Sequence, residues 1–376
     1  WRDIERGRTE AAKDMGFVGN VLERNSESLE LIAKASGMRV CRFKRDYTGN
    51  PWAIELPEMM PLMSVGRLVK VKAALEMARG NAEEAFKWTA VALRIPQAYN
   101  GEPFLVCHIT RIALSIEAFN TMQDALRGGK LTERQLGELK RLAAAQYEPD
   151  AMHRAIRCER AGGFTFIKML AEGTTPASFL KMMYPTPTEL IEQMKNPGTG
   201  AWFMAEMKNY LDMMGEAIAA CDVPLPARLA EGEKIEQEIE RIKKLPLGQK
   251  RTRLFSMLLV PGLTSVFTMD AYCMALSRAA QVAVEIEKHR LGAGQYPDTM
   301  KTLAEKLGEA AIDPHSGKPL LYNRTDKGYL VWSVGPNGKD DGAKNAAYFV
   351  DGEERGWDDI VWYGGGEKRP RPRPEE

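Results

Sequence analysis

Carboxylates gather near the end of the sequence, between Asn337 and Asp359. Seven acidic residues lie there, against three basic ones. The acidic residues are Asp340, Asp341, Asp351, Glu353, Glu354, Asp358 and Asp359. Such a segment repels itself unless water solvates it or a cation bridges it. Calcium takes about six to eight oxygen ligands in flexible geometry, whereas magnesium demands stricter octahedra. The composition therefore indicates a calcium-binding loop, and the alternative is a solvated loop held by hydrogen bonds alone.

A second group of residues with acid–base chemistry lies in the part of the chain that reads as helical. Its members are Glu102, His108, Glu117, Glu148, His153 and Cys158. Any two of them could meet in a cleft as general acid and base, although no spacing requires it. The sequence contains no nucleophile elbow, phosphate loop, His-Glu-x-x-His motif or dinucleotide fingerprint. An enzyme with a carboxylate and histidine site in the helical body is therefore the alternative hypothesis, and it predicts a deep pocket where two of these groups converge.

Methionine is unusually frequent, with 20 residues in the chain. Many of them lie in the segments 59–63 and 182–214. A thioether can ligate copper, line an adaptable peptide groove or fill an irregular helical core. We favour core filling, and a groove formed by residues 182–214 would require a contiguous exposed apolar patch. Glu285 and His289 lie four residues apart on one helix face, which supplies at most half of a metal site.

The composition is that of a globular protein. The 376 residues are 44% hydrophobic and 27% charged with a net charge of +1, which disfavours extensive disorder and nucleic-acid binding. The five cysteines form no Cys-x-x-Cys pair, so neither a zinc knuckle nor a disulfide scaffold is expected. The most apolar stretch, 254–267, is shorter than the roughly 20 residues of a membrane span. Because the sequence begins with Trp1 rather than Met, we expect a processed chain whose membrane anchor preceded it.

The first two-thirds of the chain predict helices arranged in hairpins. Apolar residues recur at helical spacing from Met63 to Arg94, with an interruption at Arg79-Gly80-Asn81. The period continues through 103–126, and Thr132 with Gln135 forms a capping box for the next helix. Residues 78–85 resemble half of a tetratricopeptide repeat, without a convincing second copy. We therefore expect an irregular helical-hairpin body over 1–253, tetratricopeptide-like in part.

The last third of the chain predicts a different unit. Residues 264–291 read as one long helix that ends at Gly292-Ala-Gly294. Segments 320–322, 328–332 and 360–363 have the composition of short strands, so a small antiparallel sheet packed on this helix is expected. The predicted fold class is mainly α, with a small α+β domain over 254–363 after the helical body. The Pro- and Arg-rich residues 364–376 are expected to form a disordered tail.

Several motifs in this region occur in a fixed order. They are Gly-x-Tyr-Pro at 294–297, Asp-Pro-x-x-Gly-x-Pro at 313–319, Ser-x-Gly-x-Asn-Gly at 333–338, Asp-Gly at 341–342 and Asp-Asp-Ile at 358–360. Together with the long helix they make residues 264–363 resemble the C-terminal domain of the type II secretion major pseudopilin. More loosely, the whole chain is similar to uncharacterised envelope proteins of planctomycete-type bacteria that end in this module.

The resemblance implies a metal site, because in that family the loop after the Ser-x-Gly strand binds calcium. Asp341 and Asp359 match the family's pattern best, and Asn337 stands where the family usually has Asp. The spacing does not fit an EF-hand. The implied calcium ligands are Ser333, through its carbonyl, and Asn337, Asp340, Asp341, Asp358 and Asp359.

These observations lead to one expected function. We expect a non-enzymatic, envelope-associated or periplasmic protein for binding or scaffolding, with a calcium-stabilised pseudopilin-like module. The expected partners are other proteins or further copies of the chain rather than nucleic acid. Contact with a membrane is expected only through an anchor that precedes this sequence.

Overall fold

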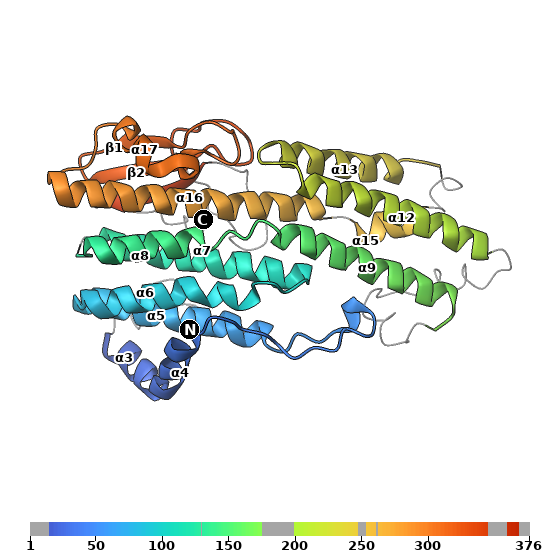
Figure 1. The fold of residues 1–376 in the computed structure, drawn as a ribbon, viewed down its shortest axis with the longest axis horizontal. Coiled ribbons are helices and arrows are strands. Elements are labelled where there is room, and N and C mark those ends of the chain that lie inside the picture. The colour runs from blue at the N-terminus through green and yellow to red at the C-terminus, as the bar shows by residue number, and fades with distance from the viewer. Residues whose placement is uncertain are drawn as a thin grey trace, which may run out of the picture.

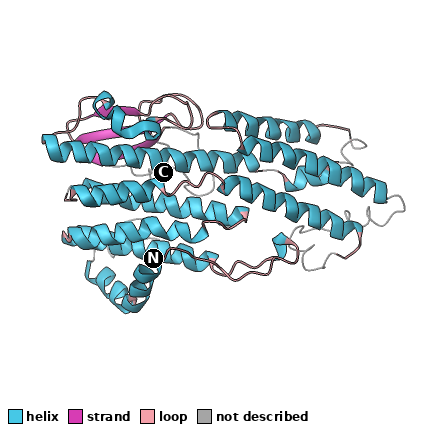
Figure 2. Cartoon of the chain, in the orientation of Figure 1, coloured by secondary structure: helices cyan, strands magenta, loops and turns pink. Residues whose placement is uncertain are grey.

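The computed structural model describes residues 15–128, 130–174, 199–246, 253–260, 262–344 and 359–367. The predicted fold class is confirmed, since helices make up most of the chain and a small antiparallel sheet lies near its end (Figures 1 and 2). Within these ranges, no helix combines the length and the apolar character needed to cross a bilayer.

The first part of the chain forms stacked antiparallel helix pairs (Figure 1). The pairs are α3 (Met15–Arg24) with α4 (Ser26–Ser36) and α5 (Met59–Arg79) with α6 (Ala82–Arg94). The next two helices, α7 (Leu105–Arg127) and α8 (Glu133–Ala144), both pack on α6 and on a later long helix rather than chiefly on each other. Gly80 ends α5 in the left-handed conformation at φ 77°, which explains the predicted interruption. Thr132 and Gln135 form the predicted capping box at the start of α8. Helical hairpins are therefore confirmed in this region.

A second group of helices lies beyond the stack, and a long helix joins the two groups. The second group comprises α9 (Ala151–Ala171), α12 (Thr199–Cys221), α13 (Ala227–Lys243) and the short α15 (Leu254–Leu259). The predicted long helix is α16 (Leu263–Ala293), which runs past both groups (Figure 1). Small residues such as Ala275 and Ala279 are fully buried in α16, so neighbouring helices pack closely around it. Short 3₁₀ turns occur at η1 (Pro51–Ala53) and η2 (Ile95–Tyr99).

The small sheet packs against the second half of α16. After the turns η3 (Met300–Leu303), α17 (Ala304–Leu307) and η4 (Gly308–Ala311), the strands are β1 (Leu321–Arg324), β2 (Gly328–Ser333) and β3 (Ile360–Gly365). Their order is β1-β2-β3, with both pairs antiparallel. Tyr329 and Trp362 on one face are fully buried and belong to the core that α16 shares. The predicted antiparallel sheet is therefore confirmed.

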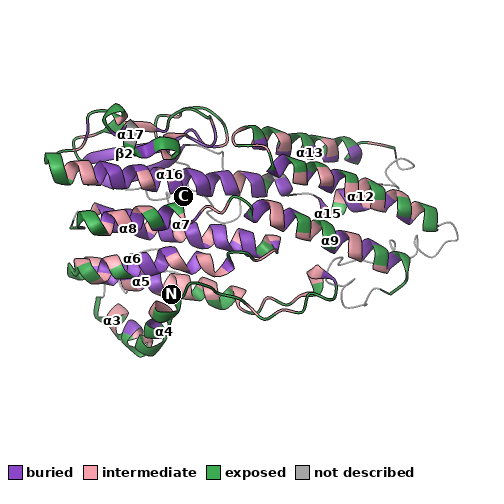
Figure 3. Cartoon of the chain, in the orientation of Figure 1, coloured by how far each residue is buried: buried purple, intermediate pink, exposed green. Residues whose placement is uncertain are grey.

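Hydrophobic packing forms two main cores. Figure 3 shows buried residues along the helices of both groups. The first contains α3–α8, the second half of α16 and the inner face of the sheet. The second contains α9, α12, α13, α15 and the first turns of α16, and Met213 and Met214 fill part of it. The sheet thus shares a hydrophobic core with the helix pairs. The sequence predicts instead that the region from residue 254 forms a domain after the helical body. Residues 182, 183 and 194 of the Met-rich segment lie outside the described residues.

The start of the predicted tail belongs to the sheet, which corrects the expectation of disorder from residue 364. Strand β3 continues through Gly365, and the Gly366 N–H donates to the Lys327 carbonyl at 2.7 Å. Gly364 lies against the ring of Tyr329, where any Cβ would overlap it. Glycine occurs there because the backbone approaches an aromatic ring closely, and not because the chain is flexible. Residues 368–376 lie outside the described residues.

Two adjacent glycines in α9 make room for two aromatic rings, Trp52 from residues 38–58 and Tyr210 from α12. A Cβ at Gly162 would overlap the Trp52 indole, and a Cβ at Gly163 would overlap the Tyr210 ring. Trp52 Nε1 donates to Glu159 Oε2 at 2.8 Å, and the Tyr210 hydroxyl donates to the Glu159 carbonyl at 2.9 Å. Both aromatic rings therefore dock on one turn of α9.

Candidate functional site

The loop after β2 is the site that the sequence predicts. Ser333 pairs with Ile360 at the ends of β2 and β3, which brings Asp359 close to the beginning of this loop. Asp359 is buried, and its two carboxylate oxygens accept the backbone N–H groups of Asp341 at 3.2 Å and Ala343 at 2.7 Å. The turn uses positive φ at Gly342 and Ala343. The loop is therefore folded back onto the start of β3.

Other predicted ligands take part in the same hydrogen-bond network. Asp340 Oδ1 accepts from Trp332 Nε1 at 3.1 Å and from the Gly342 N–H at 2.9 Å. Asn337 donates from Nδ2 to Asp341 Oδ2 at 2.8 Å. Asn337, Asp340, Asp341 and Asp359 thus lie along one folded turn. Asp358 lies outside the described residues.

The electrostatics of this turn would favour a cation. Burial raises the pKa of Asp359 above its ordinary value, two backbone donors lower it, and the Asp340 and Asp341 carboxylates raise it further. A bound cation would relieve that repulsion. Among the described residues, however, no three His, Cys, Asp or Glu side chains are grouped as they would be around a metal ion. The oxygens present suit calcium in kind, but the described part of the loop does not gather them into a ligand set.

The Ser333 hydroxyl accepts from the Gly335 N–H of this loop at 3.1 Å, but it donates to a cluster that the sequence analysis missed. The Ser333 hydroxyl donates to Asp313 Oδ1 at 2.6 Å, and His315 Nδ1 lies 3.0 Å from the same hydroxyl. Asp313 also accepts from the His315 N–H at 3.0 Å, the Ser316 hydroxyl at 2.8 Å and the Val334 N–H at 3.2 Å. Burial alone would raise the pKa of Asp313, but the His315 side chain, with Nδ1 3.7 Å from Oδ1, and the hydroxyl and backbone donors lower it to about 2.

This cluster contains Ser, His and Asp, yet its geometry differs from that of a nucleophilic triad. Ser333 donates directly to Asp313, whereas a triad serine donates to the histidine that acts as its base. All three residues are buried. The cluster therefore clamps the 313–319 turn to the end of β2. Both motifs are visible in the sequence, but no local signal pairs them.

The six acid–base candidates of the helical body are dispersed. Glu102 pairs with Arg45 at 2.9 Å, Glu117 with Lys70, Glu148 with Arg154, and His153 with Asp222 at 3.8 Å. Burial raises the pKa of the Cys158 thiol to about 11, which disfavours the reactive thiolate. In the part of the chain that the structure describes, no hydrogen bond or ion pair joins two of the six. The convergence predicted by the enzyme hypothesis is not found there.

His108 instead belongs to a buried polar contact between the two helix groups. Its Nε2 lies 3.3 Å from Asp270 Oδ1, and Asp270 Oδ2 lies 3.6 Å from a guanidinium nitrogen of Arg228. The three residues come from α7, α16 and α13, and each is less than 10% exposed. The contact therefore links three helices. Removal of one partner would be destabilising, because it would leave the remaining polar groups buried without an interaction partner.

Neither the protein-family models, nor the curated proteins, nor the solved structures contain a match to this chain.

Proposed function

We propose that this chain is a non-enzymatic binding or scaffold protein of the cell envelope, with a C-terminal α+β module that calcium stabilises. The observation that carries the proposal is the turn over residues 337–343, which is folded back onto the buried Asp359 carboxylate. Carboxylates held in a fixed turn are better preorganised for a cation than those of a mobile loop.

Further support comes from the order of elements in the module. A long helix is followed by a three-stranded antiparallel sheet that packs on it, and the acidic turn leaves the end of β2. This order agrees with the resemblance to the type II secretion pseudopilin module. Protein partners or self-assembly follow as part of the proposal, because stacked helix pairs present extended surfaces to other proteins.

Calcium titration of the full chain, followed by thermal unfolding, tests this proposal. A ligand that binds only the folded state stabilises it by about 2.7 kcal/mol at 100 times its Kd. We expect calcium to raise the melting temperature, EDTA to reverse the rise, and magnesium to have a smaller effect. An unchanged melting temperature with calcium and with EDTA would contradict the metal site.

Two matched variants locate the effect. Asp341→Asn removes a carboxylate of the turn while retaining an acceptor for Asn337, and it should abolish most of the calcium-induced shift. Asp326→Asn is the control, because it removes a carboxylate from the turn between β1 and β2. Equal shifts in both variants would place the calcium elsewhere.

A further inference from the structure

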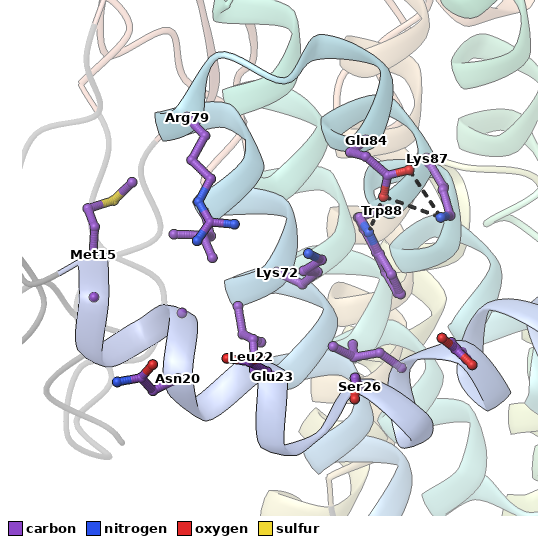
Figure 4. Close-up of a pocket in the computed structure, with 15 residues that line it drawn as sticks. Met15, Asn20, Leu22, Glu23, Ser26, Lys72, Arg79, Glu84, Lys87 and Trp88 are labelled. Carbon is purple, nitrogen blue, oxygen red and sulfur yellow. Dashed lines mark hydrogen bonds and ion pairs between the residues drawn. The ribbon is translucent and has the colours of Figure 1, made fainter.

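A groove separates the first helix pair from the second at the end of the stack (Figure 4). It lies between α3–α4 and α5–α6 and has a volume of about 540 Å³. Pockets that bind small ligands typically have about 300–1,000 Å³. Its floor is apolar, with the buried side chains of Leu22, Leu29, Leu75 and Trp88. The groove therefore has room for a few residues of a peptide and an apolar surface against which one side chain could pack.

The α5–α6 wall of this groove carries Lys72, Arg79 and Lys87 (Figure 4). The carboxylates that these cations contact lie three or four residues away on the same helices, at Glu76 and Glu84. Of these pairs, Lys87–Glu84 is exposed on both sides. Such exposed pairs contribute only about 0.3–0.5 kcal/mol, so a ligand carboxylate can compete for Lys87. Glu76 is buried and holds Lys72 at 2.6 Å. This wall can therefore receive an anionic group.

The α3–α4 wall carries the opposite charge. Glu23 and Glu30 line it, and both are exposed. Among the residues that the structure describes, neither carboxylate has an ion-pair or side-chain hydrogen-bond partner, and no ion pair crosses the groove. The charges of the two walls therefore face the groove without neutralising each other, which favours a ligand that brings a cation to one wall and an anion to the other.

The groove narrows where Arg79 approaches α3, and its floor is held in place. Gly16 and Gly19 line the groove from α3, and a Cβ at Gly19 would lie 3.2 Å from an Arg79 nitrogen. Trp88 is held in place because its Nε1 donates to Glu84 at 3.0 Å, while the ammonium of Lys87 lies 5.4 Å from the ring centroid. The apolar floor is thus fixed before any ligand arrives, which lowers the entropic cost of binding.

We propose that this groove binds a short peptide segment in which an apolar side chain lies between one basic and one acidic residue. The basic residue faces Glu23 and Glu30, the acidic residue faces Lys72 and Lys87, and the apolar side chain packs on Trp88. This inference rests on the proposed binding role of the helical body and assigns its ligand class.

Binding of synthetic peptides to the full chain, measured by isothermal titration calorimetry, tests the proposal. The dipolar probe is acetyl-Lys-Ala-Leu-Leu-Ala-Glu-amide. Its comparators carry Glu at both ends, Lys at both ends, or Ser in place of Leu. We expect the dipolar probe to bind about tenfold more tightly than each comparator, and added salt to weaken it. Equal affinities, or no binding of any peptide, would overturn the proposal and leave the calcium experiment unaffected.

Reversing the charge of the α3–α4 wall should change which peptide binds best. A variant that had merely lost its fold would not gain a new preference. The double variant Glu23→Lys/Glu30→Lys should prefer the peptide with Glu at both ends by about tenfold over the dipolar probe. The control Glu27→Lys/Glu216→Lys makes the same change in net charge at exposed positions that do not line the groove. If the double variant does not fold, Glu23→Gln alone should weaken the dipolar probe several-fold. An unchanged peptide preference in the reversed variant, or unchanged affinity in Glu23→Gln, would refute the assignment.

Discussion

Buried carboxylates have opposite properties in the two regions of the molecule. In the C-terminal module, Asp313 has a pKa lowered to about 2. In the second helical core, burial raises the pKa of Glu206 to about 7, although the Leu254 and Phe255 N–H groups donate to it at 2.7 and 2.9 Å. Both residues are almost completely buried.

The difference follows from the number of donors that each carboxylate accepts. Asp313 accepts from four groups, two on each oxygen. Glu206 accepts from two backbone groups at the start of α15. Burial penalises the charged form in both cases, and only at Asp313 do the larger set of donors and the neighbouring His315 side chain outweigh that penalty. Asp313 therefore stabilises the module as an anion, whereas Glu206 is held in an environment that favours its neutral form.

Replacement of Asp313 by Asn should have the largest effect. The amide offers one acceptor oxygen where four donors require acceptors, and its own N–H₂ group would face two of them. We expect the free energy of unfolding to fall by about 3–5 kcal/mol, measured by urea denaturation at pH 7. Asp326→Asn, in an exposed turn of the same module, should change it by less than about 0.5 kcal/mol.

Acid should reveal the same interaction in the unchanged protein. The ordinary pKa of Asp313 is 3.8 and its folded value is about 2, so the unfolded chain takes up the proton first. Its contribution, about 2 kcal/mol, is present above pH 3.8 and is lost as the pH falls through 2. Asp313→Asn should lack this part of the acid dependence. A variant with the same acid dependence as the original would contradict the low pKa.

Glu206 should give a pH dependence of the opposite sign. Its pKa is raised from 4.5 to about 7 on folding, so the folded state binds the extra proton between these values. Its favourable contribution is therefore present below pH 4.5 and is lost as the pH rises through 7. The loss is on the order of 3 kcal/mol, because one pKa unit corresponds to about 1.4 kcal/mol.

The variant Glu206→Gln separates the contribution of Glu206 to the pH dependence of stability from that of other titrating groups. We expect the difference in unfolding free energy between pH 5 and pH 8 to be smaller in Glu206→Gln than in the original protein. Glu216→Gln changes an exposed residue of the same helix and should leave the pH profile unchanged. If Glu206→Gln retains the full pH dependence, another acid with a raised pKa, such as the half-buried Glu159, is responsible.

These contrasts also explain what the sequence could and could not predict. The break at Gly80 and the capping box of Thr132 and Gln135 were predictable, because each depends on residues within one helical turn. The clamp between Asp313 and Ser333 spans 20 residues, and the contact between Trp52 and Glu159 spans 107. Such pairs depend on tertiary packing, which cannot be predicted from the local periodicity of the sequence.

The candidate site shows the same limit on a smaller scale. The acidic composition of the turn was visible in the sequence, and so was the position of Asp359 before a strand. What was not visible is that backbone N–H groups already occupy both oxygens of Asp359. The Ser333 hydroxyl likewise already has partners, because it donates to Asp313 and accepts from the Gly335 N–H. Residue types therefore predicted the location of the site, but not the partners that each oxygen has.

Asp359 separates the effect of donor number from the effect of region, and its replacement should be the mildest of the three. It lies in the same module as Asp313, yet it has two backbone donors like Glu206, and its pKa is raised. In Asp359→Asn one oxygen keeps its donor and one hydrogen bond is lost, while the repulsion from Asp340 and Asp341 is relieved. We expect a loss of about 1–2 kcal/mol in urea denaturation. A loss as large as that of Asp313→Asn would mean that the module, rather than the number of donors, determines how strongly a buried carboxylate stabilises the fold.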